Sequence, residues 1–280
     1  MGPFPADPHP MNHHLDPRNP IGVFDSGVGG LTVVRALMER LPFESIYYFG
    51  DTARVPYGVK SVQTIAHYTT QITEFLLEKQ VKLLIIACNT MAAVSAQVVR
   101  DLSPTPVLDV IEAGALAALA ATRSNRIGVI GTPTTINSNA YARAIHTIEP
   151  QARLTSQACA LFVPLVEEGW LDHPVTRLTA QEYLKPVLAE KIDTLVLGCT
   201  HYPLLKPLLQ DVAGPDVTLV DSANAMAEST AALLTDMNLH TPRPTAPEYR
   251  FWVTDVPLRF QTIGERFLGR TLGNVHVTSL

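Results

Sequence analysis

Two cysteines occupy matching positions in the two halves of this 280-residue chain. Cys88 follows the apolar run 83–87, and Cys199 follows the apolar run 195–198. Small polar residues come next in both cases, so each thiol is expected where a strand gives way to the N-terminus of a helix. That position lowers a thiol pKa from about 8.5 and prepares the sulfur to exchange protons. One such cysteine could be a small buried hydrophobic residue, but a matched pair favours a function.

Polar residues directly after both thiols extend these two candidate sites: Asn89, Thr90, Thr200 and His201. Free N–H groups at the start of a helix, together with Asn or Thr side chains, form pockets of the size of a carboxylate. His201 lies two residues past Cys199, where its imidazole can hydrogen-bond or protonate at the same edge. The pattern predicts a small ligand with carboxylate groups.

Acidic residues follow three further apolar runs. Residues 21–24 end in Asp25 and Ser26, where a carboxylate can cap the next helix, face a ligand, or do both. Residues 162–166 are expected as a strand or loop that ends in two acids, Glu167 and Glu168. The loop after the run 45–49 contains Asp51, Pro56, Tyr57 and Gly58. Its N–H groups and phenol hydroxyl either bind a small anion or form a plain turn.

The glycine-rich run 27–30 resembles part of a dinucleotide-binding turn, and Asp51 follows at about the distance of a ribose-binding acid. Two details oppose this interpretation. Thr32 stands at the sixth position of the glycine motif, and Asp25 would place a negative charge beside a pyrophosphate. The sequence also has no P-loop lysine, no zinc-protease motif and no clustered Cys/His spacing. It therefore predicts neither a nucleotide cofactor nor a metal.

The elements that must position these residues alternate between strand and helix. Expected strands are 21–24, 45–49, 83–87, 107–110 and 127–130, and expected helices are 61–79, 92–100 and 112–122. Such alternation predicts mostly parallel sheets with helices on both faces. The strand starts at 21 and 127 are 106 residues apart, and the two cysteines are 111 apart. We therefore expect two similar α/β units whose ligand-binding sheet edges meet across one cleft.

Composition limits the class of protein. Hydrophobic residues make up 46% of the chain and charged residues 17%, which supports a packed core throughout. The net charge of −5 speaks weakly against binding to nucleic acid or an anionic membrane. Three sparse cysteines, of which Cys159 is expected in the core, predict a reducing, cytoplasmic location. Residues 1–20 are expected to be a flexible N-terminal extension and not a secretion signal.

Two thiols on opposite sides of one cleft, with anion-binding turns beside them, suit removal of a proton from one face of a carbon and delivery from the other. That chemistry is racemisation or epimerisation. The residues that carry it resemble the glutamate racemase family of bacterial cell-wall synthesis. The matching segments are residues 23–31, 50–52, 56–58, 87–90, 197–204 and 264–269. These segments occur in the same order as in the family. The resemblance runs from about Ile21 to the end of the chain.

The resemblance implies a cofactor-independent reaction that interconverts L- and D-glutamate and supplies D-glutamate for peptidoglycan. It implies that Cys88 takes the α-proton of D-glutamate and Cys199 that of L-glutamate, while Asp25 and His201 assist the two thiols. Asp51 and Glu167 would be supporting acids, with Glu168 as the alternative to Glu167. Substrate-binding residues would be Asp25, Ser26, Asp51, Pro56, Tyr57, Gly58, Cys88, Asn89, Thr90, Thr200 and His201. Ala160 departs from the family, which usually has proline there.

The resemblance also implies how the chain is divided. One domain would combine residues 21–110 with 221–280, the second would be 111–220, and the active site would lie between them. A homodimer is usual in the family, and neither a nucleic acid nor a membrane is an expected partner. Two alternatives stay open: an aspartate or hydantoin racemase of the same superfamily, which would keep both cysteines, and a module that binds glutamate without catalysis.

Overall fold

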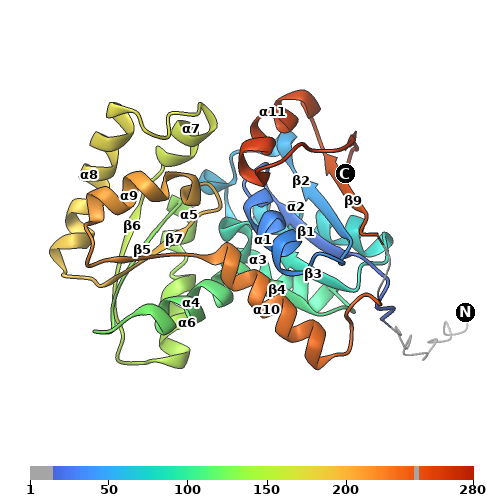
Figure 1. Ribbon diagram of the computed structural model, residues 1–280, viewed down its shortest axis with the longest axis horizontal. Helices are drawn as coiled ribbons and strands as arrows, with labels where there is room; N and C mark the ends of the chain where they lie inside the picture. The colour runs from blue at the N-terminus through green and yellow to red at the C-terminus, as the bar shows by residue number, and fades with distance from the viewer. Residues whose placement is uncertain (1–14, 243–245) are drawn as a thin grey trace, which may run out of the picture.

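The computed structural model describes residues 15–242 and 246–280. It contains two separate sheets with helices packed around each, which confirms the predicted fold class (Figure 1). Every strand pair in both sheets is parallel. Residues 1–14, most of the expected N-terminal extension, lie outside the described residues.

The larger sheet has six strands in the order β10-β9-β2-β1-β3-β4. These strands are β1 (Ile21–Asp25), β2 (Ile46–Gly50), β3 (Leu83–Ile86), β4 (Val107–Asp109), β9 (Tyr249–Val253) and β10 (Val275–Val277). Strands from both ends of the chain therefore share one sheet. Its central strands β1 and β3 are buried along their whole length, because helices cover both faces.

The smaller sheet has four strands in the order β6-β5-β7-β8. These strands are β5 (Arg126–Gly131), β6 (Arg153–Ala158), β7 (Thr194–Gly198) and β8 (Thr218–Asp221). In register, Gly131 at the end of β5 lies opposite Gly198 at the end of β7. In the larger sheet, Asp25 lies opposite Gly50 in the same way. Because parallel strands all end at one edge, the segments that follow them gather there.

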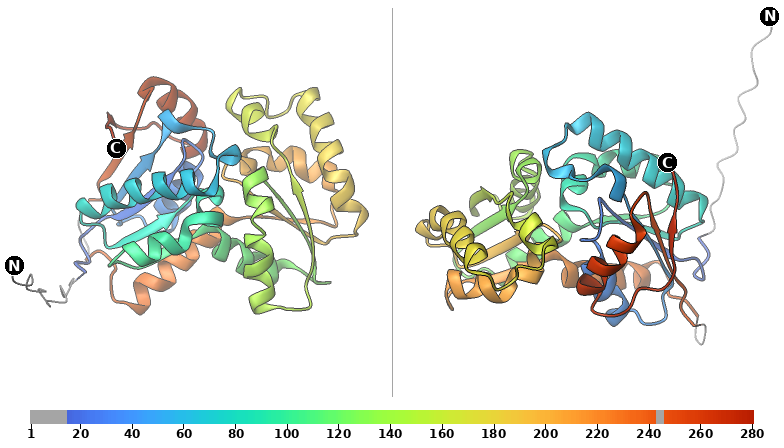
Figure 2. Two further views of the ribbon diagram at one scale, coloured as in Figure 1. Left: turned by 180° about the vertical axis from the view of Figure 1, so that it is seen from behind. Right: turned by 90° about the horizontal axis from the view of Figure 1, so that it is seen from above.

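Helices connect the strands of both sheets. They are α1 (Leu31–Arg40), α2 (Val62–Glu78), α3 (Asn89–Leu102), α4 (Val110–Ala121), α5 (Pro133–Asn137), α6 (Ala140–Ile148), α7 (Phe162–Glu167), α8 (Pro174–Ala189), α9 (Lys206–Ala213), α10 (Ser222–Asp236) and α11 (Pro257–Leu268). Short 3-10 turns are η1 (Thr52–Arg54), η2 (Tyr57–Val59) and η3 (Tyr202–Leu205). Helix α10 packs against both α1 and α4 and so joins the two units (Figure 2).

One sequence-based expectation about an element is wrong. The run that includes Phe162 and Val166 is helix α7, not a strand or loop. Five consecutive apolar residues suggested a short strand, but the two buried members are four residues apart, which is helical spacing. Pro164 is tolerated because it stands in the first turn, where its missing N–H has no helical partner to lose.

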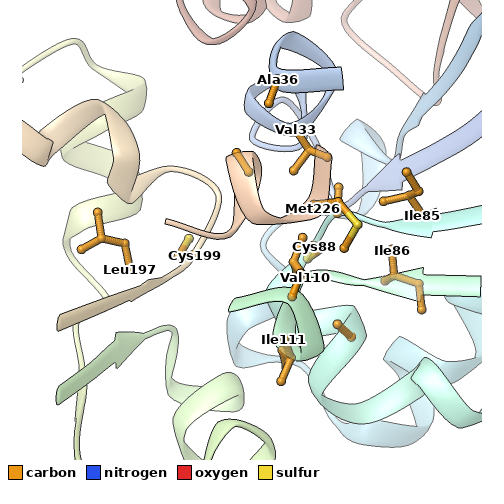
Figure 3. Close-up of a cluster of buried hydrophobic side chains, with 14 of the residues drawn as sticks. Val33, Ala36, Ile85, Ile86, Cys88, Val110, Ile111, Leu197, Cys199 and Met226 are labelled. Atoms are coloured by element: carbon orange, nitrogen blue, oxygen red, sulfur yellow. The ribbon is translucent and has the colours of Figure 1, made fainter. Parts of the chain in front are cut away.

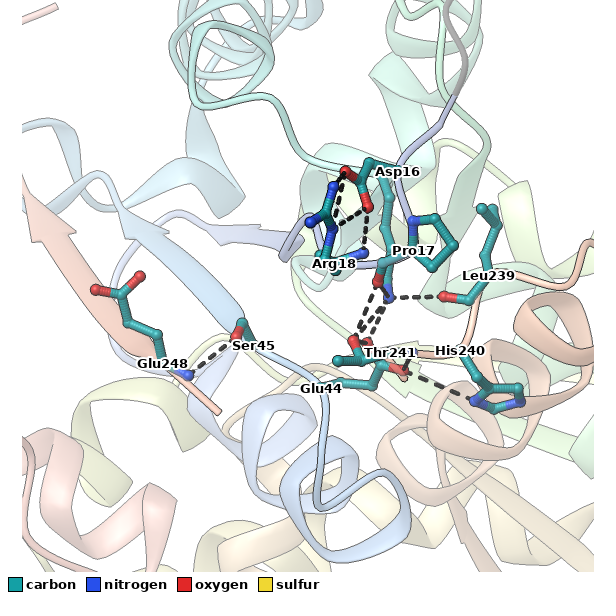
Figure 4. Close-up of polar contacts among 10 residues, drawn as sticks. Asp16, Pro17, Arg18, Glu44, Ser45, Leu239, His240, Thr241 and Glu248 are labelled. Atoms are coloured by element: carbon teal, nitrogen blue, oxygen red, sulfur yellow. Dashed lines mark hydrogen bonds and ion pairs between the residues drawn. The ribbon is translucent and has the colours of Figure 1, made fainter. Parts of the chain in front are cut away.

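The described part of the N-terminal extension is tied to the larger sheet. The Lys82 ammonium, fully buried, donates to the carbonyls of Pro17 and Leu239 and pairs with Glu44 at 2.5 Å. Thr241 Oγ1 donates to Glu44 as well (Figure 4). A buried lysine needs such partners, because an unpaired ammonium in the interior is strongly disfavoured. The network holds three distant segments together at the end of the sheet where β3 begins.

The two units approach each other closely beside the strand ends. A Cβ on Gly29, in the turn after β1, would lie 2.7 Å from His201 Nδ1 and closer still to Thr200 Oγ1. Only glycine therefore allows this turn to rest on the segment after β7. Within the described residues, no helix is long and apolar enough to cross a membrane.

Candidate active site

A cavity of about 440 Å³ lies between the strand ends of the two sheets. From the larger sheet come the segments after β1, β2 and β3, and from the smaller sheet those after β5, β6 and β7. Cys88 and Cys199 enter it from the two opposite units (Figure 3). The fold thus brings together two thiols that are 111 residues apart in the sequence.

Most of the predicted site residues line this cavity. They are Ser26, Pro56, Tyr57, Gly58, Cys88, Asn89, Thr90, Glu167, Cys199, Thr200 and His201. Asp25 and Asp51 do not line it and lie one layer behind, at 1% and 0% exposure. Of the two candidate acids on α7, Glu167 faces the cavity and Glu168 is exposed to solvent.

Cys88 immediately precedes α3 and is 5% exposed. Its Sγ lies 3.7 Å from Ser26 Oγ. Burial and the nearby Asp25 carboxylate raise the pKa of Cys88 to about 12, although hydrogen bonds from the Met91 and Ser26 backbone act in the opposite direction. The expectation of a lowered pKa is therefore wrong for this thiol. Desolvation outweighs the helix N-terminus, so this sulfur is protonated at neutral pH.

Asp25 lies behind Cys88 and bridges to the opposite unit. Its Oδ1 accepts the Gly27 N–H at 2.8 Å, and its Oδ2 lies 3.5 Å from Thr200 Oγ1. The carboxylate thus caps the turn after β1, while α1 starts further on with Gly30 as its N-cap. Burial raises the pKa of Asp25 against the attraction of His201. A carboxyl group with a raised pKa next to a thiol can pass a proton to it.

Cys199 has a different partner. Its Sγ lies 4.0 Å from His201 Nδ1, and His201 Nε2 lies 3.2 Å from Glu167 Oε1. Burial lowers the pKa of His201, but the hydrogen bonds to Cys199 and Glu167 outweigh it and raise that pKa to about 10. The hydrogen bond from His201 also lowers the pKa of Glu167. An imidazolium held by a carboxylate therefore stands beside Cys199.

Asn89 offers a free hydrogen-bond donor to the cavity. Its Oδ1 accepts from the Tyr141 hydroxyl at 2.7 Å, which fixes the orientation of the amide. Its Nδ2 is buried and has no hydrogen-bond partner among the described residues. A buried donor without a partner costs free energy unless a ligand satisfies it. The amide N–H₂ is therefore positioned to donate to a bound carboxylate.

Tyr57 contributes its ring and not its hydroxyl to the cavity. The hydroxyl donates to Asp51 Oδ2, which also accepts from Arg54 Nε at 2.6 Å. Thr254 Oγ1 donates to the other carboxylate oxygen at 2.9 Å. Asp51 thus holds the loop 51–57 in place from behind and makes no direct contribution to the cavity wall.

Sequence reasoning missed part of the lining: Gly27, Val55, Val59, Thr132, Pro133, Ala160, Val163 and Pro164. Thr132 is the polar member of this set with a clear structural role. Its Oγ1 lies 2.9 Å from Thr90 Oγ1 and accepts from the Thr135 N–H at the start of α5. A signal existed, because Thr132 follows the end of β5 as Thr200 follows β7. Nothing local marked the valines as cavity residues.

Comparison with known proteins places this geometry in a family. The sequence pattern of the Asp/Glu/Hydantoin racemases matches residues 21–230. This chain belongs to the Asp/Glu/Hydantoin racemase family. A glutamate racemase from Syntrophus aciditrophicus is 74% identical over 96% of this chain and all of the relative. One from Neisseria meningitidis is 62% identical over 94% of this chain and 97% of the relative.

A solved racemase structure agrees with the fold. Glutamate racemase from Francisella tularensis, in complex with D-glutamate, superposes with a TM-score of 0.89 and 44% identity. The match covers 94% of this chain and 98% of that one. The resemblance to the glutamate racemases inferred from short motifs therefore extends over nearly the whole chain, and a racemase is an isomerase.

Proposed function

We propose that this chain is a cofactor-independent glutamate racemase in which one thiol takes the α-proton of the substrate and the other delivers a new proton to the opposite face. The observation that carries the proposal is the placement of Cys88 and Cys199 on opposite sides of one cavity. Glutamate held between them can lose its α-proton to one sulfur, and the planar carbanion that results can gain a proton from the other sulfur on its opposite face, which inverts the carbon. High identity to glutamate racemases supports glutamate as the substrate.

The direction of each step is taken from the family resemblance. Cys199, beside the imidazolium of His201, acts as the base for L-glutamate, and the neutral thiol of Cys88 delivers the proton that gives D-glutamate. In the reverse direction Cys88 is the base, and Asp25 takes up its proton. Glu167 keeps His201 protonated. Proton transfer by such positioned groups contributes typically about 10²–10⁴-fold to a rate.

Polar groups on both sides of the thiols hold the substrate in this proposal. Asn89 Nδ2, which has no hydrogen-bond partner in the part of the chain that the structure describes, donates to one carboxylate together with Thr90 and Thr200. Ser26 and the backbone around Pro56 and Gly58 bind the remaining polar groups. Asp51 acts indirectly, through Tyr57.

We further propose the domain division 21–110 with 221–280 and 111–220. The strand membership supports it, because β9 and β10 belong to the sheet of β1, whereas β8 closes the other sheet. From the family resemblance we also propose that the chain forms a homodimer, that it is located in the cytoplasm and that it supplies D-glutamate for peptidoglycan.

The test is a circular dichroism assay of purified protein with L-glutamate, D-glutamate and L-aspartate in separate reactions. The proposal expects loss of the signal for both glutamate enantiomers and a stable signal for aspartate. Treatment with a chelator should leave the rate unchanged. Racemisation of aspartate instead of glutamate would show that the chain is an aspartate racemase. Binding of glutamate without turnover would show that it is a non-catalytic binding module.

A further inference from the structure

One helix of the larger sheet's unit contacts the acid–base pair of the other unit. Helix α11 follows β9 of the six-stranded sheet and stands opposite α7 (Figure 1). Arg259, Ile263 and Phe267 are spaced four residues apart and so lie on one face of α11. Two of these residues, together with Arg266, contact Glu167 or His201, the pair assigned above to the Cys199 side.

Phe267 determines how the imidazole is held. Its side chain is fully buried, and its ring meets the ring of His201 edge to face, with centroids 5.1 Å apart and planes at 76°. Edge-to-face pairs are favourable and specific in orientation. The orientation matters here, because His201 reaches Cys199 with Nδ1 and Glu167 with Nε2. A rotation of the ring would weaken both contacts.

Two arginines hold Glu167 from the other side. Arg259 Nη2 lies 3.8 Å from the carboxylate Oε2, and Arg266 Nη1 lies 3.5 Å from the Glu167 carbonyl oxygen. Glu167 is the last residue of the six-residue helix α7, whose terminal carbonyls have no helical partner. A cation at that end is favourable. Gly169, with a φ of +78°, leaves room for Arg266, whose Nη1 would lie 2.9 Å from a Cβ at that position.

We propose that α11 is a positioning element for the reaction, in which Phe267 fixes the plane of His201 and Arg259 and Arg266 fix Glu167. The C-terminal part of the chain thereby sets the proton transfer on the Cys199 side, although neither thiol belongs to it. This inference rests on the proposed racemase function. Phe267 and the two arginines do not line the cavity, so they act on catalysis through the pair and not through substrate contact.

A double-mutant cycle separates this role from a general contribution to folding, because residues that act through a shared partner have non-additive effects. Phe267→Leu is made in the wild-type protein and in a His201→Gln background. We expect kcat to fall about 10-fold in the wild type, with KM within about 2-fold, and by less than about 2-fold in the second background. Phe260→Leu is the matched control. It is the same substitution in the same helix, at a buried residue that packs on Tyr48, and its effect should be equal in both backgrounds.

Arg259→Gln provides a second double-mutant cycle. This substitution should leave the stability of the fold nearly unchanged, because the Arg259 side chain is 62% exposed. We expect a loss of about 3-fold in kcat in the wild type and none in a Glu167→Gln background. Arg270→Gln, just beyond the end of α11, is its control.

Equal losses in both backgrounds for Phe267→Leu and for Arg259→Gln would overturn the positioning role while leaving the racemase function intact. A wild-type protein that does not racemise glutamate would contradict the proposed function first, and the inference with it. Melting temperatures of all variants show whether a lost rate reflects lost structure.

Discussion

The two thiols of the cleft occupy similar positions in the backbone, but the charged groups beside them differ in sign. Both follow a buried parallel strand, and they are 5% and 6% exposed. Cys88 lies near a carboxyl group, Asp25, whereas Cys199 lies near an imidazolium, His201, which Glu167 holds. Similar strand ends in the two units thus place the two thiols, and the neighbouring side chains give them different electrostatic surroundings. In the proposed mechanism, Cys199 is the base for L-glutamate and Cys88 is the acid.

The largest expected effect comes from removing either sulfur. Cys88→Ala and Cys199→Ala should each reduce racemisation by at least about 10³-fold, because each removes a proton donor and acceptor that no other group replaces. Cys159→Ala, a buried cysteine away from the cavity, serves as the control and should keep its rate. Circular dichroism at saturating glutamate measures all three. Substantial turnover in either of the first two variants would contradict the two-thiol account.

The partner of Cys199 comes next. His201→Gln should lower kcat about 10²-fold, because the imidazolium held beside Cys199 by Glu167 is lost. The corresponding change on the other side, Asp25→Asn, removes a negative charge from beside Cys88. We expect it to lower the pKa of that thiol below about 12, the value set by burial and by Asp25. Thiolate absorbance during a pH titration of the Cys199→Ala variant measures this shift, and an unchanged midpoint would show that Asp25 does not control Cys88.

The order of alkylation tests the asymmetry without substrate. With iodoacetamide at pH 8, Cys88 should react more slowly than Cys199, since only the thiolate reacts and burial together with Asp25 raises the pKa of Cys88 to about 12. Cys159, at 0% exposure, is the internal reference for an inaccessible thiol. Mass spectrometry of timed digests gives the three rates. Faster modification of Cys88 would reverse the assignment of acid and base.

The smallest expected effect is on the pH profile. The pKa of His201 is raised from 6.5 to about 10, so its positive charge persists to that pH and is lost above it. We expect kcat/KM to decline as the pH rises through about 10, and we expect this decline to be missing in His201→Gln.

The raised pKa of His201 also stabilises the fold. This stabilisation is complete below pH 6.5 and is lost as the pH rises through about 10. Urea unfolding of wild type and variant across this range should show their stabilities converge.

The sequence was sufficient to predict the alternation of strands and helices, the matching positions of Cys88 and Cys199 at two strand ends, and most of the cavity lining. These depend on local patterns, such as the apolar runs before Cys88 and Cys199. The state of Cys88 was not predictable, because its raised pKa comes from burial by distant segments. The same holds for the Tyr57 hydroxyl, which turns to Asp51, and for Phe267, which meets His201 from 66 residues further along the chain. The Phe267–His201 contact arises only when the two units come together.

The most direct test of the central claim is α-proton exchange in D2O. Purified protein is incubated with L-glutamate, and proton NMR follows the α-position while circular dichroism follows the enantiomer. The account predicts that deuterium enters at Cα as the optical signal disappears, because the proton delivered by Cys88 comes from the solvent-exchanged thiol. An unlabelled substrate whose optical signal stays constant, with D-glutamate equally inert, would contradict it.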